Sequence, residues 1–376
     1  GYDHPTLYNL KLENVNNIYG NLNIYSDYLY SSTGNANYNL FMFDTFEVPM
    51  QSRNRLIISA NKDLMYLMFS NNRYFIGDNV DITGYKEIDK IGDTKLYENT
   101  DVLPFMYVSY NYYNKTDFSK KSFPYNNEIL LNNVVVNEKT NNEFKTNIKE
   151  TFIRQSNIKY MDPSIINNGD RITVKKDNSR MLIDVPEVAR NKILFVSFNL
   201  EPQSCKVGDL LVNINGNTNK LTCREWKYYN GNITFNYVIS GDTSNKVEVT
   251  FSKGIYKIDN LKIYYMDYND IKDVNKKVTK VDIDSKTKGD KIYASVEAEK
   301  DGYFVTTLPY DKGFTIKVDN KKIDYEKVNT AYVGFKISKG KHDIVIEYKA
   351  PFKTLGLIMS FAGIIVYILF YHKNLI

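Results

Sequence analysis

The stretch HDIVIEYKAPFKTLGLIMSFAGIIVYILFY, residues 342–371, joins two kinds of secondary structure. Residues 342–348 have the length and composition of a β-strand. Ala350-Pro351 interrupts that pattern, since proline lacks the N–H that a β-ladder needs. Residues 355–371 carry no charge and reach the lower end of the length that spans a bilayer. The stretch therefore predicts a strand that leads directly into a transmembrane helix, which we place at residues 354–372.

The residues beside the apolar segment fit a membrane helix. Lys353 precedes it, His372 and Lys373 follow it, and Tyr371 stands where aromatic side chains meet the bilayer surface. The alternative is a buried core helix. We favour the membrane helix because the segment is apolar on every side and lies at the C-terminal end.

Small residues follow one face of this helix. Gly356, Ser360 and Gly363 are spaced i, i+4 and i+7, and small residues allow close packing of helices in lipid. The chain starts with Gly1 and shows neither an initiator Met nor a signal-peptide pattern. We therefore expect further membrane helices upstream of Gly1 or in a partner. The alternative is a lone membrane anchor.

Composition favours strands and excludes nucleic-acid binding. The chain of 376 residues has 32 Tyr and 20 Phe, which are common in strands. Its net charge is only +5, and no long run of Lys and Arg occurs. Two cysteines, Cys205 and Cys223, leave both a disulfide and free thiols open. The cysteine-poor, Tyr- and Asn-rich composition favours a cell-membrane location, with the bulk of the chain outside a Gram-positive-type cell.

The pattern along the chain predicts a mixed α/β N-terminal part, followed by mainly β domains of the β-sandwich or jelly-roll type, ending in one transmembrane helix. Short helices are expected at residues 35–46, 61–70 (capped by Asn61) and 122–133. Turns at Asn215-Gly216 and Asp319-Asn320 separate predicted strands. The predicted units are 1–110 (α/β), 111–189 (irregular or helical connector), 190–270 (β-sandwich), 271–290 (linker), 291–350 (small β-sandwich) and 354–372 (transmembrane helix).

No sequence motif identifies a catalytic centre in this chain. His4, His342 and His372 are far apart in sequence, which argues against a His-dependent triad or metal site. Asp282 and Asp284 form a D-x-D pair, but they stand in a charged connector and are more typical of a solvated surface. We therefore expect no catalytic residue, no metal site and no cofactor.

Aromatic residues are the candidates for carbohydrate contact. Trp226, the single Trp, and Tyr228 fall on one face of a strand if residues 225–229 alternate. A sugar ring stacks well on such flat side chains. The alternative places Trp226 in the core of a sandwich.

The C-terminal part resembles the YfhO-like family of bacterial integral membrane proteins. The resemblance lies in residues 303–317 (YFVTTLPYDKGFTIK), 318–322, 331–336 (AYVGFK), Gly340-Lys341-His342 and the junction at 348–357. A weaker match covers residues 74–76, 96–99 and Leu103-Pro104. Where the family tends to have Trp and Asp-Gly, this chain has Phe314 and Asp319-Asn320.

The resemblance implies a role in sugar transfer. Family members look like multi-spanning glycosyltransferases of the GT-C type, which move a sugar from a polyprenyl-phosphate carrier to a cell-envelope polymer such as lipoteichoic acid. Their catalytic carboxylates lie in loops between early membrane helices, so none is carried over to this chain. The implied partners are the cell membrane, other transmembrane helices of the same protein, the glycopolymer, the polyprenyl-phosphate sugar and a polyprenyl-phosphate glycosyltransferase.

The leading hypothesis is an extracytoplasmic C-terminal region that positions the acceptor polymer, with Trp226, Tyr228 and Tyr310 as candidate substrate-binding residues. Tyr310 belongs to the 309–313 loop, for which a structural turn is the alternative. A second hypothesis is a membrane-anchored surface module that binds carbohydrate or protein without catalysis. A third is a membrane-attached glycoside hydrolase, which needs two carboxylates in one cleft.

Overall fold

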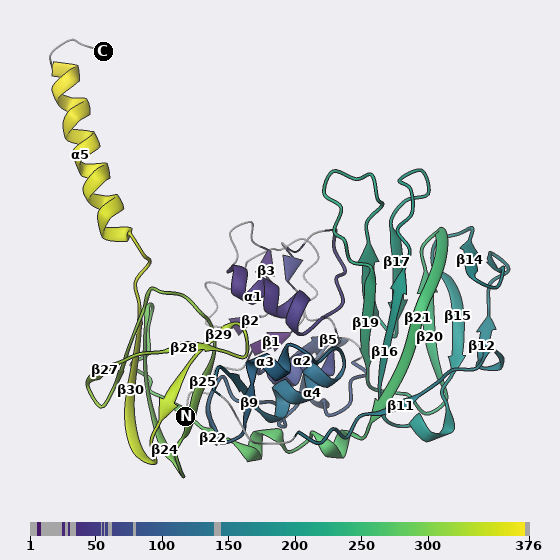
Figure 1. Ribbon diagram of the computed structural model, residues 1–376, viewed down its shortest axis with the longest axis horizontal. Helices are drawn as coiled ribbons and strands as arrows, with labels where there is room; N and C mark the ends of the chain where they lie inside the picture. Colours follow the sequence, from purple (N-terminus) through teal and green to yellow (C-terminus); the bar gives the residue numbers. More distant parts are fainter. Residues whose placement is uncertain are drawn as a thin grey trace.

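The computed structural model describes residues 6–8, 25–26, 29–30, 35–53, 55, 57–58, 62–77, 80–138 and 144–372. Figure 1 shows an N-terminal layer of short helices and strands between two β-sandwiches, with one helix projecting from the body. The sequence-based fold class is confirmed: the described chain is mostly β, has a mixed α/β N-terminal part and ends in an apolar helix.

The N-terminal layer forms helices in the three segments where the sequence predicts them, and it has one further short helix, α3, that the sequence did not predict. Asp63 caps the second α-helix, because its side chain accepts a hydrogen bond from Tyr66 N at 3.0 Å. The predicted cap, Asn61, lies outside the described residues. The helices are α1 (Ala36–Leu40), the π-helix η2 (Phe41–Thr45), α2 (Leu64–Phe69), α3 (Lys115–Phe118) and α4 (Tyr125–Asn132).

Short strands complete this layer. One sheet has the order β2-β1-β5-β7-β6, and the pairs β3–β4 and β9–β10 lie apart from it. The strands are β1 (Thr6–Tyr8), β2 (Tyr25–Ser26), β3 (Leu29–Tyr30), β4 (Ile57–Ile58), β5 (Tyr74–Gly77), β6 (Lys86–Ile91), β7 (Thr94–Glu98), β9 (Tyr112–Asn114) and β10 (Val134–Val136).

The central sandwich packs two mainly antiparallel sheets face to face. Their orders are β13-β14-β21-β16-β19, with β11 also paired to β21, and β12-β15-β20-β17-β18. The strands are β11 (Lys149–Thr151), β12 (Ile158–Tyr160), β13 (Ile165–Asn167), β14 (Arg171–Val174), β15 (Ser179–Asp184), β16 (Ile193–Leu200), β17 (Leu210–Ile214), β18 (Asn217–Leu221), β19 (Thr234–Ile239), β20 (Lys246–Phe251) and β21 (Gly254–Met266).

Strand pairing brings residues 149–184 into this sandwich, although the sequence predicts a connector there. Strand β14 runs through this part of the chain because Ile172 and Val174, two positions apart, pack on the core of the sandwich. The turn at Asn215-Gly216 is confirmed. Both residues have positive φ, 46° and 87°, as a two-residue hairpin turn requires.

The C-terminal sandwich incorporates one strand from far upstream. Its sheets have the orders β22-β8-β25-β29-β28 and β23-β24-β30-β26-β27. The turn at Asp319-Asn320, with φ of 51° and 64°, joins two of these strands as predicted. The strands are β8 (Met106–Ser109), β22 (Thr279–Lys280), β23 (Asp282–Ile283), β24 (Lys291–Ala298), β25 (Gly302–Pro309), β26 (Phe314–Val318), β27 (Lys321–Ile323), β28 (Glu326–Val328), β29 (Tyr332–Ile337) and β30 (Gly340–Tyr348).

The N-terminal layer shares its core with both sandwiches. Phe41 and Phe69 pack in one cluster with Phe195 of the central sandwich and Tyr332 of the C-terminal one. Buried Asn329 adds a polar connection, since its Oδ1 accepts from Val135 N at 2.7 Å and its N donates to Val135 O at 2.9 Å. The N-terminal layer therefore packs between the two sandwiches and connects them through a shared core.

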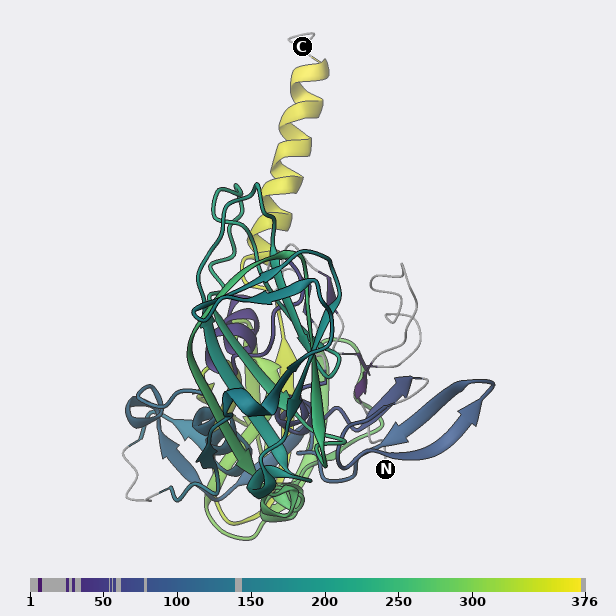
Figure 2. The same ribbon diagram turned by 90° about the vertical axis from the view of Figure 1, so that its right-hand side faces the viewer.

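Helix α5 (Lys353–His372) stands clear of this body (Figure 2). None of it is buried, and its mean hydropathy is 2.1. In the part of the chain that the structure describes, it is the one helix that is long and apolar enough to cross a membrane. A hydrogen-bonded turn connects it to β30, with Lys353 N donating to Ala350 O at 3.2 Å.

Cys205 and Cys223 form a disulfide with a Cα–Cα distance of 4.8 Å, which answers the question that the sequence left open. The bond closes the loop before β17 onto the loop after β18. It spans 18 positions, and closing a loop of that size stabilises a fold by about 3 kcal/mol through restriction of the unfolded chain.

We predict that the double variant Cys205→Ser, Cys223→Ser loses about 3 kcal/mol of unfolding free energy, measured by urea denaturation. A reducing agent should lower the stability of the parent protein by a similar amount and leave the variant unchanged. Equal stability of parent and variant under oxidising conditions would contradict the bond.

A second prediction concerns Asp63, whose pKa burial raises to about 7. The folded chain holds this proton more tightly than the unfolded chain, where an Asp has a pKa of about 3.9. The unfolding free energy therefore falls as the pH rises from about 4 to about 7. Asp63→Asn keeps a capping oxygen and removes this titration, so we expect it to raise the melting temperature only at the upper end of that range.

Asp63→Ala serves as the control. It removes the cap and should lower the unfolding free energy by about 1 kcal/mol relative to Asp63→Asn at every pH. A melting temperature of Asp63→Asn that parallels the parent protein across the pH range would show that Asp63 does not titrate as described.

Candidate functional site

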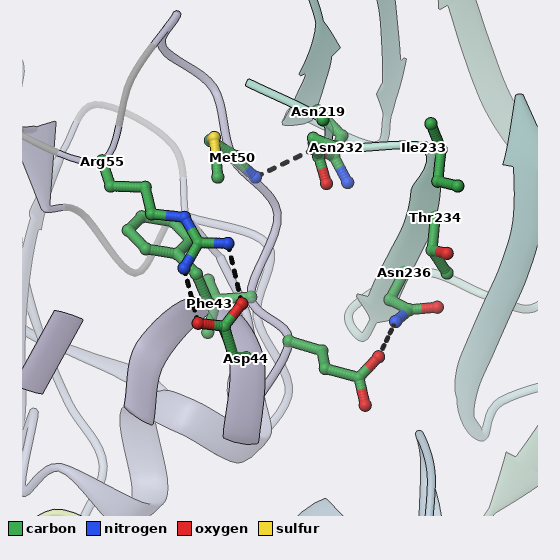
Figure 3. Close-up of a pocket in the computed structure, with 12 residues that line it drawn as sticks. Phe43, Asp44, Met50, Arg55, Asn219, Asn232, Ile233, Thr234 and Asn236 are labelled. Carbon is green, nitrogen blue, oxygen red and sulfur yellow. Dashed lines mark hydrogen bonds and ion pairs between the residues drawn. The ribbon is translucent and has the colours of Figure 1, made fainter. Parts of the chain in front are cut away.

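A pocket of about 150 Å³ lies where the N-terminal layer meets the central sandwich (Figure 3). The end of η2 and the segment after it line one side, and the approach to β19 lines the other. The polar side chains around it are Asp44, Glu47, Arg55, Asn219, Asn232 and Asn236.

A second pocket of about 360 Å³ adjoins the first. Both are lined by Glu47, Thr234 and Asn236, so they meet across these three residues. The second pocket adds amide groups and a cation from the outer face of the sandwich, at Asn199, Asn260 and Lys262. We call the two pockets together the amide groove.

The backbone places Glu47 at the centre of this groove. The π-helix η2 ends with Phe46 N donating to Phe41 O at 2.7 Å and Val48 N donating to Met42 O at 3.0 Å. Glu47 lies between these bonds with a φ of 60°. This left-handed conformation is costly for a residue with a side chain, by about 1–3 kcal/mol, and residues so held are concentrated at functional sites.

Two amides hold the Glu47 side chain. Asn236 Nδ2 donates to one carboxylate oxygen at 2.6 Å, and Asn126 Nδ2 donates to the other at 3.1 Å. Burial raises the pKa of Glu47 above its ordinary value, and the hydrogen bonds from the Phe123 backbone, Asn126 and Asn236 oppose that rise. The carboxylate is thus fixed in place and partly withdrawn from water.

Asn236 carries an unused acceptor. It is 3% exposed, lines both pockets, and its Oδ1 has no hydrogen-bond partner in the described chain. A buried amide oxygen without a partner costs about 1–3 kcal/mol. The oxygen itself is shielded from solvent, so it can accept a hydrogen bond from a ligand only if the Asn236 side chain rotates toward the groove.

The rim of the groove is built from paired side chains. Arg55 binds Asp44 through two hydrogen bonds of 2.5 and 2.7 Å, and its guanidinium lies 5.7 Å from the Phe43 ring centre. Asn232 Nδ2 donates to Asn219 Oδ1 at 2.6 Å. Amide and carboxylate groups fixed in this way match ligands that present several hydroxyl groups.

No metal site is found within the described ranges, where no three His, Cys, Asp or Glu side chains converge. Asp284 instead accepts hydrogen bonds from Lys286, which lower the pKa of its carboxyl group. His342 bonds Asp319 at 2.8 Å on the surface of the C-terminal sandwich.

The structure places Trp226 and Tyr228 in a loop, so the strand alternation predicted for residues 225–229 is wrong. Turns between β18 and β19 replace the strand, and the rings of Trp226 and Tyr228 meet edge to face at 5.4 Å. Trp226 is half-buried and is absent from the sandwich core, so the alternative of a core Trp is also wrong.

Tyr310 lies elsewhere, in the C-terminal sandwich. Its N donates to Ala331 O at 2.7 Å, and its carbonyl accepts from Asn37 Nδ2 at 2.9 Å. These bonds fit the structural turn that the sequence left as an alternative. The structure therefore brings Trp226 and Tyr228 together and leaves Tyr310 apart from them.

The sequence did not identify Glu47 or Asn236. The signal for Asn236 was a single polar residue inside the apolar run 235–239 of a predicted strand. The signal for Glu47 was its position between a predicted helix and Pro49, a common place for a helix C-terminus. Neither signal shows that the two residues meet, since 189 positions separate them.

Comparison with known proteins identifies the family. A family model described as bacterial membrane protein YfhO matches residues 13–360. One relative, the uncharacterized protein YfhO of Bacillus subtilis strain 168, is 24% identical over 296 residues. The match covers 77% of this chain and 34% of the relative, so the chain spans about a third of that protein.

Two solved structures show distant likeness. The N-terminal CBM22-1–CBM22-2 tandem domain of Paenibacillus barcinonensis Xyn10C matches 55% of this chain and 84% of its own, at 10% identity and a TM-score of 0.19. The arabinofuranosyltransferase AftD from Mycobacteria matches 50% of this chain and 23% of its own, at 9% identity and a TM-score of 0.18. At these TM-scores neither likeness supports an inference about this chain. The family model, which matches most of the chain, does: the chain belongs to the YfhO family of bacterial membrane proteins.

Proposed function

We propose that this chain is the extracytoplasmic C-terminal region of a membrane glycosyltransferase, and that its amide groove positions the acceptor glycopolymer. The observation that carries the proposal is the groove itself. A fixed carboxylate, Glu47, lines both pockets of a space large enough for a sugar unit, and Asn236 beside it keeps a buried amide oxygen without a partner in the described chain.

The chemistry of the groove favours a hydroxyl-rich polymer that carries phosphate. The Glu47 carboxylate offers acceptors, and Asn199, Asn232, Asn236 and Asn260 belong to the same amide-rich lining. Lys262 supplies a cation in the second pocket, whereas Arg55 in the first pocket is already paired with Asp44. A teichoic-acid-like chain has hydroxyl groups and phosphodiesters at regular spacing, so it can occupy both pockets at once.

The disulfide supports an extracytoplasmic position for the body. Disulfides persist in oxidising surroundings and are rare in the reducing cytosol. On this proposal a polyprenyl-phosphate sugar supplies the donor, a separate polyprenyl-phosphate glycosyltransferase charges that carrier, and membrane helices outside this chain hold the catalytic carboxylates. The predicted sugar contacts of Trp226, Tyr228 and Tyr310 stay predictions.

A second candidate function is glycoside hydrolysis, because Asp44 and Glu47 line one pocket. Glu47 has the raised pKa of a general acid. Asp44, however, has both oxygens bound by Arg55, which leaves it poorly placed to attack a sugar or activate water. The groove therefore favours binding. A binding module without any transferase partner is the other alternative, and a full-length gene without upstream membrane helices would favour it.

We predict that Glu47→Gln weakens binding of deacylated lipoteichoic acid by about tenfold or more, since a hydrogen bond to a charged group contributes about 1.5–3 kcal/mol. Binding to the parent protein should weaken as the pH falls through the raised pKa of Glu47, because protonation removes an acceptor. The variant should lose that pH dependence. Titration calorimetry measures both effects.

Asn168→Ala is the matched control, since Asn168 is exposed and lies outside the groove. It should bind like the parent protein at every pH. Equal affinity of Glu47→Gln and the parent protein would exclude the groove as the polymer site. Release of reducing sugar ends by the parent protein, and its loss in Glu47→Gln, would establish hydrolysis instead.

A further prediction applies in cells. The full-length gene carrying Glu47→Gln should yield normal amounts of membrane protein and a cell-envelope polymer with fewer sugar substituents, measured by compositional analysis. An unchanged polymer alongside weakened binding in vitro would contradict the acceptor role and leave carbohydrate binding as the function.

A further inference from the structure

The disulfide-bridged end of the central sandwich lies on the same side of the molecule as α5. The loop before β17 (residues 201–209) and the loop before β19 (residues 222–233) rise from the body in the direction in which α5 leaves it (Figure 1). Figure 2 shows the same arrangement after a quarter turn, with the loops reaching the level at which α5 begins. If α5 crosses a bilayer, these loops meet the surface of that bilayer.

The second loop carries a concentration of interfacial aromatic residues. Trp226, Tyr228 and Tyr229 stand within four positions, with Tyr228 62% and Tyr229 38% exposed. Trp and Tyr prefer the boundary between headgroups and acyl chains, because their rings are apolar and their polar atoms need a wet partner. These three aromatic side chains do not belong to the core of the central sandwich, so its packing does not explain their presence.

Charge at the loop ends complements an anionic lipid surface. Lys206, Arg224 and Lys227 are exposed there. The carboxylate of Glu225 is engaged by Cys205 N at 2.7 Å. Asp209 is paired with Arg53 at 3.0 Å. Positive side chains near a membrane surface are attracted to anionic headgroups within a Debye length.

The loops are held in one shape. The disulfide joins them, the bond from Cys205 N to Glu225 crosses between them, and the Arg53 guanidinium lies 5.5 Å from the Trp226 ring centre. A preorganised loop loses little conformational entropy when it contacts a surface.

We propose that loops 201–209 and 222–233 form a second membrane contact, in which Trp226, Tyr228 and Tyr229 enter the headgroup region of an anionic bilayer. This contact and α5 together support the body at two points. With the body supported at two points, the opening of the amide groove toward β19 stays at a fixed distance from the membrane. A polymer anchored in the same membrane would start within that distance.

The single Trp of the chain makes a direct test possible. The chain is reconstituted through α5 into vesicles of equal parts phosphatidylcholine and phosphatidylglycerol, with and without bromine on the acyl chains. We expect Trp226 emission to shift to shorter wavelength and to lose most of its intensity when the lipids are brominated. Aqueous iodide should quench it only weakly.

The matched control moves the Trp to the other end of the sandwich. The variant Trp226→Phe, Phe152→Trp places it after β11, at a residue that is 68% exposed. Its emission should respond to iodide and not to brominated lipid. The variant Lys206→Glu, Arg224→Glu, Lys227→Glu, which keeps Trp226, should lose quenching by brominated lipid when phosphatidylglycerol is present.

Trp226 emission that iodide quenches and brominated lipid does not would overturn the proposal. The same result combined with a spectral shift on adding deacylated lipoteichoic acid would assign the aromatic cluster to carbohydrate instead. Quenching by brominated lipid that is equal in the two Trp positions would also overturn it, because the contact would then not be specific to this end of the sandwich.

Discussion

The architecture depends on the burial of strand β16 on both faces. Leu194, Val196 and Phe198 point into the core of the central sandwich, whereas Ile193 and Phe195 belong to the core of the N-terminal layer. Each such side chain contributes about 1.5–3 kcal/mol when fully buried, so the outer face of this sheet needs a cover. The helices of the N-terminal layer provide it. Their position against β16 and β19 in turn sets Glu47 opposite Asn236, which is why the groove lies where it does.

The regular parts of this fold follow from local sequence patterns. Alternating residues predict β16, β17, β20 and most strands of the C-terminal sandwich, the Asn215-Gly216 and Asp319-Asn320 pairs predict their turns, and an uncharged run predicts α5. The failures have a common cause. Residues 225–229 contain strand-forming aromatics but have no neighbouring strand with which to pair, so the disulfide and nearby side chains decide their conformation. The pairing of β8 within the C-terminal sandwich also cannot be read from local sequence, because its partner residues are 279–280 and 303–306.

Sequence patterns predicted the candidate groove less well than they predicted the fold. Its two central side chains come from segments 189 positions apart, and one of them depends on a left-handed backbone at the end of a π-helix. Propensity gives no reason for a glutamate in that conformation. It follows from tertiary contacts, namely the amides of Asn126 and Asn236 that hold the carboxylate. A polar residue in an otherwise apolar strand was the only local sign of Asn236.

The membership of β8 in the C-terminal sandwich has a consequence for how the chain is made. Both neighbours of β8, β22 and β25, are encoded roughly 200 residues later, so at a synthesis rate of about 5–20 residues per second the strand waits roughly 10–40 s with both edges open. An unpaired strand of four buried residues is a site for wrong pairing with other chains. A shortened gene that begins after residue 110 would therefore produce a sandwich that lacks the second strand of one five-stranded sheet.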